Sequence, residues 1–66
     1  MTKNSFSTRL REARLMMGFS MDKLVERTHG AITKQSISRY EKGIMRPKRD
    51  ALKAISNALN ISEEYF

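Results

Sequence analysis

Apolar residues recur along most of the chain at intervals of three and four positions, which places them on one face of an α-helix. These faces predict four helices, over residues 7–17, 21–28, 34–42 and 49–59, and a short last turn that begins at Ser62. No stretch alternates apolar and polar residues for long enough to form a strand. The pattern therefore predicts an all-α fold with five helical elements.

Residues that commonly begin and end helices stand at the expected boundaries. Ser20 and Thr33 can cap the second and third helices, because a side-chain oxygen at that position accepts a hydrogen bond from a free backbone N–H. Gly18 and Gly43 follow the first and third helices, and Asn60 follows the fourth, where a left-handed residue often closes the last turn. The boundaries predicted from periodicity and from capping therefore agree.

The apolar faces point to a single core. The face of the first helix would consist of Phe6, Leu10, Ala13 and Met17. The third helix would turn Ile37 inward, together with either Tyr40 or Glu41. Across the chain, the predicted core comprises Phe6, Leu10, Leu24, Ile37, Leu52, Ile55 and Leu59.

Length and composition exclude several kinds of site. A chain of 66 residues allows one small domain. It has no cysteine and a single histidine, so neither a disulfide framework nor a zinc site is expected, and no cofactor is predicted. No apolar run approaches the roughly 18 residues that indicate a membrane span, so no membrane partner is predicted either.

The positive charge is concentrated in one part of the chain. Lysine and arginine number 13 against 7 aspartate and glutamate residues, a net charge of +6. Residues 33–49 carry six of the basic residues, opposed only by Glu41. Such a concentration is typical of a surface that binds a polyanion, although many charged runs are simply solvated.

The second and third helices would be short, close together and joined by a tight connection. The third would present Lys34, Gln35, Ser38 and Arg39 outward. A polar, basic helix in that position indicates a helix-turn-helix over about residues 20–42, in which the later helix enters the major groove of DNA. Pattern alone leaves open that these helices merely pack against their neighbours.

One segment resembles a known family. The sequence Thr-Lys-Gln-Ser-Ile-Ser-Arg-Tyr-Glu-Lys-Gly at residues 33–43, followed by Pro47 and by the apolar spacing of residues 52–62, is similar to the Cro/repressor-type helix-turn-helix family. This is the xenobiotic-response-element family of bacterial and phage regulators. Residues 10–24 resemble its first two helices. The resemblance covers about residues 6–66 and implies a compact five-helix, lambda-repressor-like domain that binds operator DNA.

The resemblance also implies roles for individual residues. The positions that face base edges are Lys34, Gln35, Ser38 and Arg39. The positions that contact phosphates are Ser20, Thr33, Ser36, Lys42, Arg46, Lys48 and Arg49. Arg14 and Glu41 match a pair that ties the first helix to the third. Glutamine can bond adenine and arginine can bond guanine through two hydrogen bonds, which is consistent with the first group.

Two features depart from the family pattern. Met21 stands where many relatives carry a glutamine that contacts phosphate, and the connection over residues 28–33 is about two residues longer than usual. This variant is similar to the N-terminal modules of regulators that are fused to a zinc-peptidase domain. Residues 1–66 are therefore predicted to form a single helix-turn-helix domain, with the N-terminal module of a longer protein as an open alternative.

The resemblance predicts a sequence-specific transcriptional regulator, in the first place a repressor. It would act in the cytoplasm of a bacterium or be encoded by a phage, and would bind a pseudo-palindromic operator as a homodimer. The turn at residues 62–66 would pack on the domain or contribute to the dimer. No Ser/His/Asp or Cys/His arrangement supports an enzyme. The alternative function is an antitoxin or adaptor module that uses the same fold to bind protein.

Overall fold

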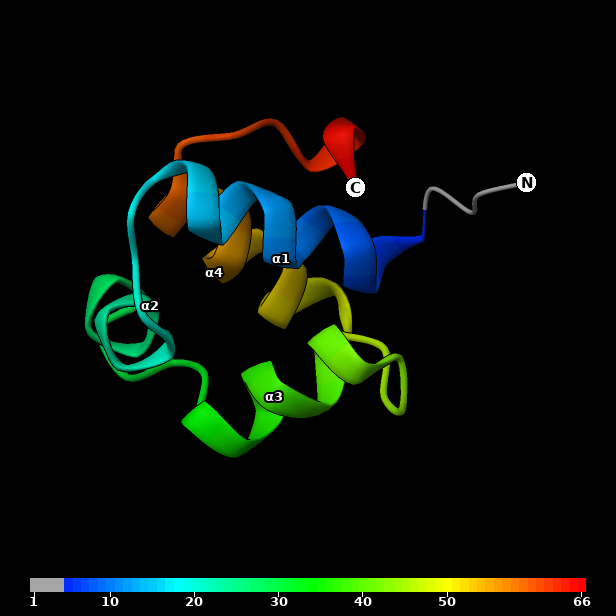
Figure 1. The fold of residues 1–66 in the computed structure, drawn as a ribbon, viewed down its shortest axis with the longest axis horizontal. Helices are drawn as coiled ribbons and strands as arrows, with labels where there is room; N and C mark the ends of the chain where they lie inside the picture. The colour runs from blue at the N-terminus through cyan, green and yellow to red at the C-terminus, as the bar shows by residue number, and fades with distance from the viewer. Residues whose placement is uncertain (1–4) are drawn as a thin grey trace.

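The computed structural model describes residues 5–66, and these residues contain helices and no strand (Figure 1). The elements in chain order are α1 (Phe6–Met16), α2 (Met21–Arg27), α3 (Lys34–Lys42), α4 (Arg49–Leu59) and the 3-10 helix η1 (Glu63–Tyr65). The all-α prediction is confirmed, but the count of five helices is not. The fifth element, η1, is only three residues long, since the chain leaves α4 at Asn60 and Ser62 caps just one tight turn.

Local capping explains where the helices begin and end. Ser20 and Thr33 each accept a hydrogen bond from the backbone N–H of the third residue of the helix that follows, α2 and α3 respectively, at 3.0 and 3.1 Å. Gly43 and Asn60 end α3 and α4 in the left-handed conformation, with φ of 77° and 57°. The predicted bounds of α3 and α4 are confirmed. The prediction for α1 lay one residue too late at both ends, and α2 ends one residue earlier than expected, with Thr28 as its C-cap.

The helices pack so that α3 has one covered side and one open side. Helix α1 contacts α3, and α2 contacts both α3 and α4, while η1 contacts α4. In Figure 1, α1 and α3 run across the view one above the other, with α2 at one end of both. Helix α3 therefore lies along an edge of the domain.

The core matches the predicted one except at its margin. The buried apolar residues are Phe6, Leu10, Ala13, Leu24, Ile32, Ile37, Tyr40, Ile55, Ala58 and Leu59. Leu52 was predicted among them but is only partly buried, because the fully covered residues of α4 all lie in its second half. Met17, which was predicted to belong to the inward apolar face of the first helix, is 42% exposed, since α1 ends before it and the chain turns away at Gly18.

The last residues of the chain fold back onto α1. The Arg9 guanidinium donates a hydrogen bond from Nη1 to the carbonyl oxygen of Tyr65 (2.6 Å) and lies 5.0 Å from the centre of the Tyr65 ring. The Phe66 and Phe6 rings are 5.3 Å apart, centre to centre. Tyr65 and Phe66 therefore pack against α1 of the same domain. This agrees with the first of the two predictions for residues 62–66, that the turn packs on the domain.

Candidate nucleic-acid interface

The connection between α2 and α3 is an ordered turn that fixes where α3 begins. The Thr28 hydroxyl donates to the carbonyl oxygen of Val25 (2.7 Å), and His29 and Gly30 are both left-handed, with φ of 59° and 78°. Ile32 then inserts into the core. A connection anchored by a buried isoleucine holds the start of α3 in one place.

The two sides of α3 differ sharply. Ile37 and Tyr40 are buried, whereas Lys34, Gln35 and Arg39 are exposed. Gln35 and Arg39 lie four positions apart, so their side chains leave the same strip of the helix. An exposed strip of this width and polarity can contact the edges of neighbouring bases.

Ser38 occupies the flank of α3 rather than the centre of its outer face. It is partly buried and lines a hollow together with Met21 and residues of α1. Of the four predicted base-contacting residues, the structure thus places three on the open face and one at its side.

Lys34 already has a partner within the domain. Its Nζ lies 3.4 Å from Oδ1 of Asp22 in α2, and both side chains are largely exposed. An exposed pair of this kind contributes at most about 1 kcal/mol, so Lys34 can exchange Asp22 for DNA at small cost. The sequence offered no sign of this pair, because it depends on how α2 and α3 are arranged.

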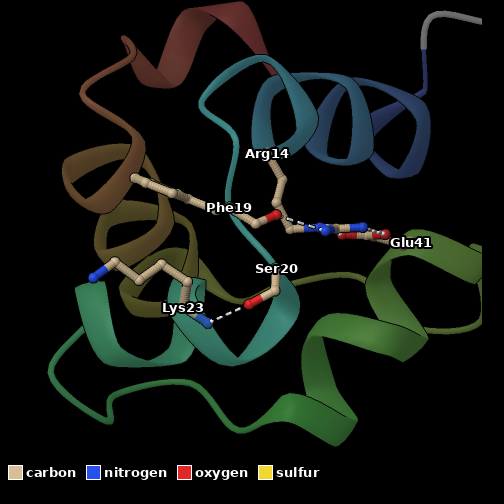
Figure 2. Close-up of polar contacts among 5 residues, drawn as sticks. All are labelled: Arg14, Phe19, Ser20, Lys23 and Glu41. Atoms are coloured by element: carbon tan, nitrogen blue, oxygen red, sulfur yellow. Dashed lines mark hydrogen bonds and ion pairs between the residues drawn. The ribbon is translucent and has the colours of Figure 1, made fainter.

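An ion pair between Arg14 and Glu41 joins α3 to α1 and to the turn before α2 (Figure 2). Arg14 donates from Nε to Oε2 of Glu41 at 2.7 Å and from Nη2 to Oε1 at 3.0 Å, while its Nη1 donates to the carbonyl oxygen of Phe19 at 2.8 Å. The two side chains are only 10% and 6% exposed. The hydrogen bond with Glu41 raises the pKa of the Arg14 guanidinium above its ordinary value, so this group stays charged. The pair therefore sets the position of α3 relative to both α1 and the turn that leads into α2.

A basic hollow of about 240 Å³ lies beside this pair. Arg11 and Lys42 line it and are exposed, and neither forms an ion pair with any other part of residues 5–66. Met21 lines it as well. Arg11 was not among the predicted site residues, although its position three residues before Arg14 puts both on one side of α1. The hollow can receive a phosphate held by two cations, with no contribution from Met21.

Two of the three serine and threonine residues predicted to contact phosphate, Ser20 and Thr33, are helix caps. Ser20 Oγ accepts from the backbone N–H of Lys23 (Figure 2), and Thr33 Oγ1 accepts from that of Ser36. The Thr33 hydroxyl also donates to Ser36 Oγ at 3.0 Å. The hydroxyl protons of Ser20 and Ser36 remain available to a phosphate oxygen, while that of Thr33 is already used.

The start of α4 is different from the starts of α1, α2 and α3, because no side chain caps it. Arg46, Lys48 and Arg49 are exposed around it. Free N–H groups at a helix N-terminus attract anions, and three cations increase that attraction. This segment is suited to bind the DNA backbone.

Within residues 5–66, no three histidine, cysteine, aspartate or glutamate side chains are grouped closely enough to hold a metal ion. None of the helices in that range has the length and apolar character needed to cross a bilayer.

A comparison with models of protein families gives a match to most of the chain. A family model described as helix-turn-helix matches residues 10–66, which include most of α1 and all of α2, α3, α4 and η1. No curated protein and no solved structure gave a match.

Proposed function

Because the chain belongs to the Cro/repressor-type helix-turn-helix family of DNA-binding transcription regulators, we propose that it represses transcription by reading an operator with α3 in the major groove. A domain that occupies an operator can exclude the transcription machinery by occupancy alone. Repression therefore requires nothing of this chain beyond tight and selective DNA binding.

The observation that carries the proposal is the asymmetry of α3. Its inner face is buried and fixed by the Arg14–Glu41 pair, whereas its outer face is polar and exposed. Cations flank it on both sides, at the hollow beside α1 and at the connection to α4. A rigid polar helix between two basic margins has the arrangement needed for a reading element between two phosphate backbones.

The proposed roles follow from these positions. Gln35 bonds adenine and Arg39 bonds guanine, each through two hydrogen bonds, while Lys34 leaves Asp22 to reach a base or a nearby phosphate. Ser38 contacts a base only at the edge of the interface. The phosphate contacts come from Arg11, Ser20, Thr33, Ser36, Lys42, Arg46, Lys48 and Arg49, with Thr33 acting chiefly as the cap of α3.

Substitutions on the two kinds of surface should have different effects. Arg39→Ala and Gln35→Ala should each lose about 1–3 kcal/mol of binding free energy on the preferred duplex and relax the preference at one base position. Arg46→Ala and Lys48→Ala should weaken binding to every duplex and lower the slope of log affinity against log salt by about one per lost phosphate contact. The measurement is fluorescence anisotropy, at two salt concentrations, with a duplex selected from a random pool and a scrambled one.

Lys53→Ala is the matched control, because Lys53 is an exposed cation on α4 outside the basic segment. It should change neither the preference nor the salt slope. An equal loss by Arg39→Ala on both duplexes would show that α3 does not read bases. If none of the variants changes DNA binding, an antitoxin or adaptor function explains the chain better.

We further propose that two copies bind a pseudo-palindrome, since one α3 contacts too few bases to select an operator in a genome. Their recognition helices would lie about 34–36 Å apart, one turn of DNA. Duplexes with two half-sites one turn apart should bind two copies cooperatively, and a shift of half a turn should abolish the cooperativity. Sedimentation of the complexes gives the stoichiometry. Nanomolar binding of a single copy to each duplex would contradict the proposal.

A further inference from the structure

A second hollow lies on the other flank of α3, away from α1. Its volume is about 410 Å³. It is bounded by the connection between α2 and α3, by α3 itself, and by the connection that leads into the first turn of α4. The residues that line it are Ala31, Ile32, Tyr40, Met45, Arg46, Lys48, Asp50 and Ala51.

The lining combines an apolar wall with a charged rim. Ile32 and Tyr40 belong to the buried core, and Met45 and Ala51 are packed against it, so these side chains are held in place. The charged members are the cations Arg46 and Lys48 and the carboxylate of Asp50, all exposed. Neither cation forms an ion pair within the described part of the chain. The rim therefore carries a net positive charge beside an apolar surface.

We propose that this hollow binds a small amphipathic anion, an aromatic or branched carboxylic acid. The apolar body of the acid lies against Ile32, Tyr40 and Ala51, and its carboxylate is turned toward Arg46 and Lys48. The volume is near the lower end of the range of about 300–1,000 Å³ for small-molecule sites. A wall with a few charged groups on one side is the usual lining of such sites, and here the excess charge selects an anion.

The regulatory consequence rests on the proposed function. Arg46 and Lys48 belong both to the rim of the hollow and to the segment proposed to bind the DNA backbone. An acid in the hollow competes with DNA phosphates for these two cations. The hollow is thus a site at which a small acid lowers DNA affinity within the 66-residue domain itself.

The first test is direct binding of 2-naphthoate to the 66-residue chain, without DNA, followed by amide NMR spectra. The expected result is saturable shifts centred on Ala31, Ile32, Tyr40, Met45 and Ala51. The neutral 2-naphthamide, which has the same apolar body, should bind at least fivefold more weakly, and acetate, which has only the charge, should produce no saturable shifts. Shifts centred on the exposed apolar residues Leu15 and Met16, or equal affinities for naphthoate and naphthamide, would overturn the proposal.

Substitutions test separately how the charge of the rim and the shape of the hollow contribute to naphthoate binding. Arg46→Gln should weaken naphthoate binding about two- to fivefold, and Asp50→Asn should strengthen it by a similar factor, because an exposed charge contributes at most about 1 kcal/mol. Ala51→Leu places extra atoms in the hollow and should abolish binding. Lys53→Gln is the control and should leave the affinity unchanged. A failure of Asp50→Asn to strengthen binding would refute the charge argument even if Ala51→Leu proved poorly folded.

The last measurement repeats the naphthoate titration in the presence of DNA. Naphthoate should weaken DNA binding by the unmodified chain and have no effect on Ala51→Leu, which retains its DNA contacts. If the chain binds no DNA at all, the proposed function fails while the naphthoate titration still tests the hollow. If DNA binds normally but naphthoate produces no saturable shifts, the proposed function stands and the acid site is refuted.

Discussion

Replacing Glu41 with alanine should lower the free energy of unfolding by about 3–5 kcal/mol, because it leaves the buried Arg14 cation without its partner. Arg14 would keep only the carbonyl oxygen of Phe19 as an acceptor. A domain of this size has a total stability of about 5 kcal/mol, so the variant should be close to unfolded at room temperature. Urea denaturation followed by circular dichroism measures the loss.

Glu26→Ala is the matched control for this variant. Glu26 pairs with Lys23 at 3.5 Å, but their side chains are 71% and 48% exposed, and the pair should contribute less than about 1 kcal/mol. The double variant Arg14→Met/Glu41→Leu should be more stable than Glu41→Ala, since it removes both buried charges. Equal losses for Glu41→Ala and Glu26→Ala would show that burial does not set the strength of the Arg14–Glu41 pair.

Helix boundaries could be predicted from the sequence where a local signal decides them. The bounds of α3 followed from Thr33, whose hydroxyl caps the helix, and from Gly43, which takes a left-handed conformation that other residues adopt at a cost. Burial could not be predicted in the same way. Leu52 and Met17 both continue an apolar face, yet whether a face is covered depends on where neighbouring elements end. Periodicity predicts the helix face on which a side chain lies, but it does not predict how far neighbouring elements bury that face.

The candidate site shows the same division. The basic segment and the outward residues of α3 could be read from the sequence, because charge and helical spacing are local properties. The contact of Lys34 with Asp22 and the place of Arg11 beside Lys42 could not, since each joins two helices whose relative position the sequence does not state. The hollow proposed to bind an acid is the feature least predictable from the sequence, because its lining residues come from several separate segments of the chain.

Leu24→Ala should lower the free energy of unfolding by about 2–5 kcal/mol, through lost burial and the cavity left behind. Leu24 is fully buried in α2, the helix that contacts both α3 and α4. Leu15→Ala removes the same atoms from a residue that is 55% exposed, and it should cost less than about 0.5 kcal/mol. Urea titrations of the two variants compare one chemical change in two environments.

The same pair of variants tests whether folding and DNA binding are linked. DNA that binds only the folded domain stabilises it by mass action, so saturating duplex should raise the melting temperature of Leu24→Ala. Its apparent DNA affinity should fall in proportion to its unfolded fraction, by the same factor on preferred and scrambled duplexes, whereas Arg39→Ala should lose affinity mainly on the preferred one. If Leu24→Ala is no less stable than Leu15→Ala, the packing of α2 against α3 and α4 is wrong. If it is unstable but duplex does not raise its melting temperature, DNA does not bind this fold.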